Sequence, residues 1–131
     1  MTEYEYDLVV VGAGPAGSSA AYAAAKNGIK VALLEKEENV AQTVRTSGVT
    51  WIDYAKEFGI PEDCYNPIKT YNFCSPNNKA SISDDKAKAA VLDVRKTYRF
   101  LAEQAKNNGA EIFVNTNVTE VITENKKVAG V

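Results

Sequence analysis

Three glycines and one glutamate are the residues of this sequence whose types and spacing best suit a chemical role. Residues 12–17 read Gly-Ala-Gly-Pro-Ala-Gly, and Glu35 follows 18 residues after Gly17. The spacing G-x-G-x-x-G binds the diphosphate of a dinucleotide when it leaves a strand and opens a helix. An acidic residue roughly 20 positions later accepts hydrogen bonds from the ribose of the same nucleotide. The sequence therefore predicts a dinucleotide site, if the flanking elements are a strand and a helix.

Each position of this fingerprint has a physical role. Gly12 permits the tight turn out of the strand, and Gly17 lets the helix pack close to the sheet. Gly14 has no side chain, so diphosphate oxygens can approach the backbone. A helix that begins at Pro15 offers them free N–H groups and a positive dipole end. Glu35 would repel a 2′-phosphate, which disfavours NADP, but FAD and NAD share the half that the fingerprint binds, so both stay open.

The flanking residues have the patterns of the required elements. Residues 7–11 are a β-branched apolar run, typical of a parallel strand covered on both faces. A helix is predicted over 15–25, ending before Asn27-Gly28, and a second strand over 29–34. This βαβ unit has the usual length of about thirty residues. It predicts an α/β fold with a Rossmann-like parallel sheet.

The middle of the chain is predicted to be mixed. Residues 36–48 are polar and aperiodic, which indicates a loop. A short helix is expected from Thr50, because Asp53 three residues later completes a capping-box pattern. Apolar residues at helical spacing would form its core face; they are Trp51, Tyr54, Ala55 and Phe58.

Short strands and one long helix are predicted for the remainder. Helix propensity favours a helix over 84–92, but we expect a strand at its end, in a hairpin that turns at Asp84-Asp85. A helix is predicted over 97–108, where Asn108-Gly109 ends it. The predicted strands are 68–73, 80–83, 89–92, 110–115, 118–123 and 128–131, the last two joined by a turn at Asn125-Lys126. Because the sequence stops inside the last strand, we expect the chain to be the front part of a longer protein.

Composition narrows the class of protein. The chain has 131 residues, of which 45% are hydrophobic and 24% charged, as in a single globular domain. The net charge of −2 gives no indication of a nucleic-acid partner. The sequence has no histidine, which excludes histidine-based catalysis and histidine metal sites, and we expect no metal. Cys64 and Cys74 are expected to be reduced thiols, and the acidic N-terminus is unlike a signal peptide, so we expect a cytoplasmic chain.

Longer stretches of the sequence resemble the N-terminal part of FAD-dependent oxidoreductases, and within them the geranylgeranyl reductase family. The stretches that carry the resemblance are residues 6–21, 31–36, 92–95, 100–105, 108–110 and 118–131. The resemblance implies a Rossmann-like FAD-binding domain with a small β-meander, incomplete at its C-terminus. Residues 1–131 would belong to this one domain, with 37–92 as an insertion after the second strand and the substrate domain absent.

The resemblance also implies which residues hold FAD. The diphosphate would lie at residues 12–17, including Pro15 and Ala16, and the adenosine ribose at Glu35 and Lys36. The other implied contacts are Arg45, the loop Thr46 to Gly48, Arg95, and the backbone of Val118. This chain departs from the family pattern at two places: Thr46-Ser47-Gly48 lacks the cysteine that many family reductases carry, and Val94 separates Asp93 from Arg95.

By the same resemblance, the function would be the reduction of double bonds in an isoprenoid lipid, met at the membrane surface. A flavin monooxygenase of the same fold, an NAD-dependent dehydrogenase and a non-catalytic nucleotide-binding module are the alternatives. No residue of this chain stands out as a catalytic acid or base, and none identifies the reductant.

Overall fold

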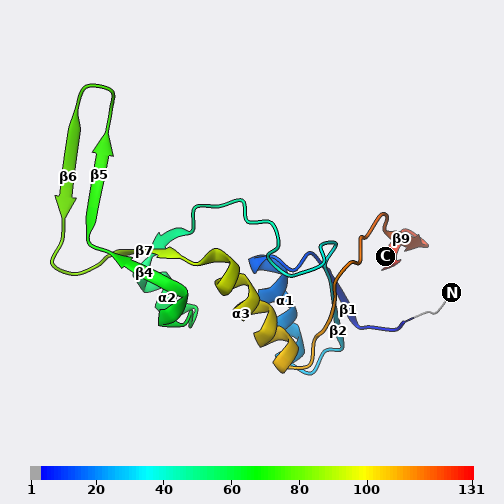
Figure 1. The fold of residues 1–131 in the computed structure, drawn as a ribbon. Coiled ribbons are helices and arrows are strands. Elements are labelled where there is room, and N and C mark those ends of the chain that lie inside the picture. Colours follow the sequence, from blue (N-terminus) through cyan, green and yellow to red (C-terminus); the bar gives the residue numbers. More distant parts are fainter. Residues whose placement is uncertain (1–3) are drawn as a thin grey trace. The chain divides into compact units, whose positions relative to one another are not determined.

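The computed structural model describes residues 4–131, which divide into two compact units (Figure 1). The first unit combines the chain up to Val44 with Tyr98–Val131, and the second unit is Arg45–Thr97. Helix α3 (Val94–Asn107) begins in the second unit and continues in the first.

A three-stranded parallel sheet forms the centre of the first unit. Its strands are β1 (Leu8–Val11), β2 (Val31–Leu34) and β8 (Glu111–Phe113), in the order β1-β2-β8. Helix α1 (Pro15–Lys26) connects β1 to β2, so the predicted βαβ unit is confirmed. Because β2 lies between two strands, it is the most buried strand of the sheet.

Small side chains allow the helices of this unit to pack closely. The buried core consists of alanines and two large residues of β2: Ala13, Ala21, Ala25, Val31, Leu33, Ala105 and Ala110. An alanine brings little apolar area, but it lets a helix approach the sheet without leaving cavities. The alanine-rich sequence of α1 is therefore a packing feature of the Rossmann-like fold.

The chain after β8 differs from the prediction. Residues 118–121 are not a strand; strand β9 (Ile122–Glu124) starts later and pairs with β10 (Lys127–Gly130) in an antiparallel hairpin. The β-branched residues of this region suggested a longer strand, but no neighbouring strand pairs with them among the described residues. The predicted turn is confirmed, with positive φ at Asn125 (49°) and Lys126 (64°).

An antiparallel sheet forms the centre of the second unit. Strand β7 (Ala89–Leu92) lies between β3 (Val49–Trp51) and β4 (Tyr65–Ile68). Helix α2 (Ile52–Glu57) and the 3₁₀ turn η1 (Glu62–Cys64) connect β3 to β4. Strands β5 (Thr70–Cys74) and β6 (Lys79–Ser83) form a separate hairpin that extends away from this sheet (Figure 1).

Three predictions for this unit are wrong in their details. The strand over 89–92 is confirmed against its helix propensity, but it pairs with β3 and β4 rather than with 80–83. The capping box is wrong, because Thr50 lies in β3 and Trp51 precedes the helix without a side-chain cap. The expected core face is also wrong: Ala55 is 3% exposed, but the three aromatic side chains of that face are more than half exposed.

No helix among residues 4–131 is long and apolar enough to cross a membrane.

Candidate functional site

The glycine-rich turn has the geometry that the fingerprint predicts. Gly12 has φ of +94°, in the region that favours glycine, and its N–H donates to the carbonyl of Leu34 at 2.7 Å. A Cβ on Gly17 would overlap the carbonyl oxygen of Gly12 and lie 3.3 Å from Cγ1 of Val10. Any side chain at position 17 would therefore push α1 away from β1.

The start of α1 is open where a ligand could approach. Gly14 precedes the helix, and a Cβ built on it would meet no atom within 4 Å. No side chain caps this helix end, and its first turn has no acidic residue. Ser18 is fully buried, and its hydroxyl donates to the carbonyl of Ala13 at 3.2 Å. This hydrogen bond ties the glycine-rich turn to α1. The positive end of the helix dipole is thus left for an anionic group.

Glu35 connects the end of β2 to the glycine-rich turn. Its Oε2 accepts a hydrogen bond from the N–H of Ala13 at 2.8 Å, and its Oε1 accepts one from the N–H of Glu37 at 3.0 Å. Each carboxylate oxygen has a further lone pair, so these bonds orient the side chain without using all its acceptor capacity. The link from Glu35 to Ala13 was missed by the sequence reasoning, which gave Glu35 a ligand role only.

A cleft of about 170 Å³ lies at the carboxyl ends of the parallel strands in the first unit. Four residues predicted from sequence line it: Gly12, Glu35, Lys36 and Val118. Ligands of open α/β sheets bind at this edge. The cleft is thus a candidate part of a nucleotide site.

Two further lining residues, Thr116 and Asn117, were missed by the sequence reasoning. The N–H of Thr116 donates to the carbonyl of Glu35 at 2.8 Å, which holds the segment after β8 beside the end of β2. The available signal was their position just after the strand predicted over 110–115, since strand ends of a parallel sheet meet at one edge.

The other predicted site residues, Arg45, Thr46, Gly48 and Arg95, belong to the second unit. Gly48 has φ of +75°, and a Cβ on it would lie 2.7 Å from Cγ2 of Val94 and 2.8 Å from the carbonyl oxygen of Leu92. The structure therefore brings the loop at Gly48 directly against the residue before Arg95. Packing alone therefore requires a glycine at position 48.

The model of the FAD dependent oxidoreductase family matches residues 7–131. The chain belongs to this family. Its fingerprint is thus that of a flavoprotein, and FAD rather than NAD is the cofactor of the family.

Individual relatives show which members of the family this chain is similar to. The chain is 41% identical to the digeranylgeranylglycerophospholipid reductase of Methanocaldococcus jannaschii, over 85% of the chain and 29% of that protein. Its structure is similar to a geranylgeranyl bacteriochlorophyll reductase-like protein from Thermoplasma acidophilum, with a TM-score of 0.83 and 32% identity, over 95% of this chain and 34% of that one. The chain thus spans about a third of the length of these relatives.

A third similarity shows the fold alone. The ternary complex of aklavinone-11 hydroxylase with FAD and aklavinone matches with a TM-score of 0.66 and 18% identity, over 99% of this chain and 29% of that one. This fold therefore serves more than one flavin chemistry.

Proposed function

We propose that this chain is the FAD-binding part of a flavoprotein reductase that acts on the double bonds of isoprenoid lipids. The observation that carries the proposal is its 41% identity to a digeranylgeranylglycerophospholipid reductase over 85% of the chain. In this proposal residues 1–131 belong to one FAD-binding domain with 37–92 as an insertion, and the substrate domain lies outside the chain. The substrate is a membrane lipid, so the proposed encounter is at the membrane surface.

The FAD diphosphate would bind at the start of α1. The open space around Gly14 admits a phosphate oxygen, and Pro15, Ala16 and Gly17 form the first turn below it. The uncapped helix end supports this assignment, because backbone N–H groups and the helix dipole both favour an anion there.

The adenosine half of FAD would bind in the cleft beside Glu35. The carboxylate of Glu35, held by Ala13, would accept hydrogen bonds from the ribose hydroxyls, with Lys36 beside it. The backbone of Val118, which lines the same cleft, would contact the adenine. The joint placement of these residues around one cleft supports the assignment.

The remaining contacts would come from the second unit: Arg45, Arg95 and the backbone of the loop Thr46 to Gly48. When bound, FAD supplies hydride chemistry, while the residues of this chain bind and orient it. The loop is held in shape by its own contacts, since the N–H of Gly48 donates to Oγ1 of Thr46 at 3.4 Å and its carbonyl accepts from the N–H of Leu92 at 2.9 Å.

A flavin monooxygenase is the second candidate function. The observation that favours it is the fold shared with aklavinone-11 hydroxylase. The two candidates differ in the product: a reductase adds hydrogen to a double bond, whereas a monooxygenase adds an oxygen atom. Mass spectrometry of a geranylgeranyl lipid incubated with a protein that joins this chain to a substrate domain, together with a chemical reductant and air, would separate them.

Binding of FAD is tested on the chain itself. The purified chain is denatured, and the released nucleotide is identified by absorbance and fluorescence. FAD affinity is then measured for wild type and Gly14→Ala by titration calorimetry. We expect a loss of about tenfold or more in Gly14→Ala, because a methyl group would occupy the place of a phosphate oxygen and its hydrogen bonds.

The matched control is Ala23→Ser, an equally small change on the exposed face of the same helix. It should bind FAD as wild type does. Equal affinity in wild type and Gly14→Ala, with both chains folded by circular dichroism, would remove the diphosphate from the start of α1.

A further inference from the structure

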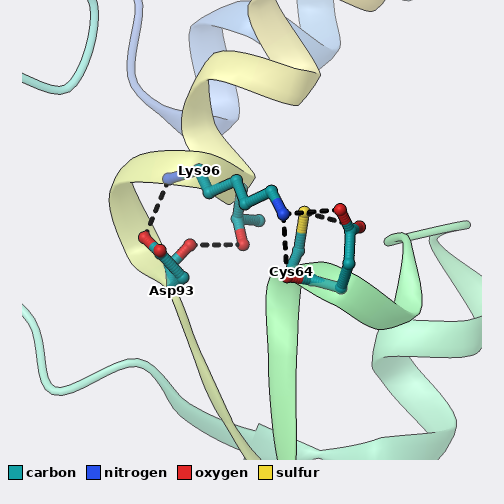
Figure 2. Close-up of polar contacts among 5 residues, drawn as sticks. Cys64, Asp93 and Lys96 are labelled. Atoms are coloured by element: carbon teal, nitrogen blue, oxygen red, sulfur yellow. Dashed lines mark hydrogen bonds and ion pairs between the residues drawn. The ribbon is translucent and has the colours of Figure 1, made fainter.

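A cluster of polar contacts ties the first turn of α3 to η1 within the second unit (Figure 2). Nζ of Lys96 donates to Oδ2 of Asp63 at 2.5 Å and to the carbonyl oxygen of Asp63 at 3.0 Å. One lysine thus holds both the side chain and the backbone of its partner. A cation is disfavoured at a helix N-terminus, and Asp63 offsets this cost for Lys96.

Asp93 fixes the same turn from its other side. Its Oδ1 accepts from the N–H of Lys96 at 3.0 Å, as an N-cap does (Figure 2). Its own N–H donates to the carbonyl of Cys64 at 2.8 Å. Its carbonyl accepts from both the N–H and Oγ1 of Thr97, each at 2.8 Å. Cys64 and Thr97 are 2% and 3% exposed, so this anchor is buried at both ends. These contacts also explain why α3 starts at Val94 and not at the predicted position 97.

Val94 and Arg95 lie between Asp93 and Lys96 in the chain, and both are connected with the proposed FAD site. Val94 packs against Gly48, and Arg95 follows it in the same helical turn. Any movement of the first turn of α3 would therefore displace Arg95 and the loop at Gly48 together.

We propose that Asp63, Asp93 and Lys96 are positioning residues, which hold Arg95 and the loop at Gly48 in the orientation that FAD requires. This inference rests on the proposed function, because it assumes that Arg95 contacts FAD. It goes further by assigning a role to three residues that do not touch the cofactor. It also accounts for the departure at Val94: the inserted residue contacts Gly48, while the aspartate before it keeps its place as the cap of the helix.

A double-mutant cycle on the full chain tests the inference. The Kd for FAD is measured by flavin fluorescence for wild type, Arg95→Met, Lys96→Met and the double variant. We expect Arg95→Met to raise the Kd about tenfold, as loss of a charge-assisted hydrogen bond does. Lys96→Met should raise it roughly threefold. Lys96→Met should cost less affinity in the Arg95→Met background than in wild type, because Lys96 then has only the loop at Gly48 left to position.

Two further variants separate positioning from general destabilisation. Lys88→Met removes an ion pair elsewhere in this unit, Lys88 with Asp84 at 3.0 Å, and should leave the Kd unchanged. Lys96→Arg keeps the charge next to Asp63 and should recover most of the affinity that Lys96→Met loses.

The failures are distinguishable. If wild type binds FAD and Lys96→Met binds it equally well, or the two losses add in the double variant, the inference is overturned and FAD binding stands. An unchanged Kd in Arg95→Met overturns it as well, because the positioned contact is then absent. If folded wild type does not bind FAD, the proposed function of the chain fails at the first measurement and the inference fails with it.

Discussion

Gly17 matters both for the fold and for the proposed nucleotide site, because only a hydrogen atom fits where other residues carry a Cβ. A Cβ there would overlap the carbonyl oxygen of Gly12, which belongs to the turn itself. We expect Gly17→Ala to lower the free energy of unfolding by about 2 kcal/mol, because overpacking outweighs the gain of about 1 kcal/mol in helix propensity. Urea unfolding followed by circular dichroism measures this change.

Gly14→Ala is the matched control for this prediction, since the added methyl group meets no atom within 4 Å. Its cost should stay below about 1 kcal/mol, the difference between glycine and alanine before a helix. Equal stability of Gly17→Ala and wild type would mean that α1 can move away from β1, and that the close approach is not required.

At the scale of elements, the sequence predicts best where local pattern and packing agree. The βαβ unit is confirmed because an apolar run, a glycine turn and an alanine-rich helix all favour it. Strand β7 was predicted but its partners were not, because pairing with β3 and β4 joins residues far apart in sequence. Strand β4 was not predicted; it contains Pro67, whose missing N–H is tolerated because β4 is an edge strand.

The ion pair between η1 and α3 predicts a pH dependence at the same scale. The hydrogen bond from Lys96 lowers the pKa of Asp63 below its ordinary 3.8, and the same bond raises the pKa of Lys96 above its ordinary 10.5. The lowered pKa means that the contribution of Asp63 is complete above its unfolded-state pKa and is lost as the pH falls through its folded-state pKa. The raised pKa means that the contribution of Lys96 is complete below its unfolded-state pKa and is lost as the pH rises through its folded-state pKa.

The difference in stability between wild type and Lys96→Met should therefore be constant from about pH 5 to about pH 9 and shrink outside that range. Denaturant midpoints over a pH series measure this difference in stability. Lys88→Met is the reference, because it removes an ion pair between two residues that are four positions apart in the sequence. A difference that grows in acid would contradict the assigned pKa directions.

Burial in the whole molecule is what the sequence predicted least well, and the clearest case is the side chains around α2. The helical spacing of Trp51, Tyr54 and Phe58 is typical of a core face, yet their exposed fractions are 57%, 53% and 68%. Only Ala55 from that face joins the small core of the second unit. Helical spacing of apolar residues predicts a covered face, but the sequence contains no local signal for whether another element covers it. Of the predicted FAD contacts, by contrast, four line one cleft, because strand ends of a parallel sheet meet at a common edge.

The exposure of Trp51 gives a prediction for the chain as a whole. Trp51 is the only tryptophan, so tryptophan fluorescence reports on this one position. We expect acrylamide to quench the folded chain almost as efficiently as the chain in urea, because Trp51 is more than half exposed. Strong protection that weakens on dilution would mean that a second copy covers the aromatic side chains. Strong protection at every concentration would contradict the exposed placement of Trp51 itself.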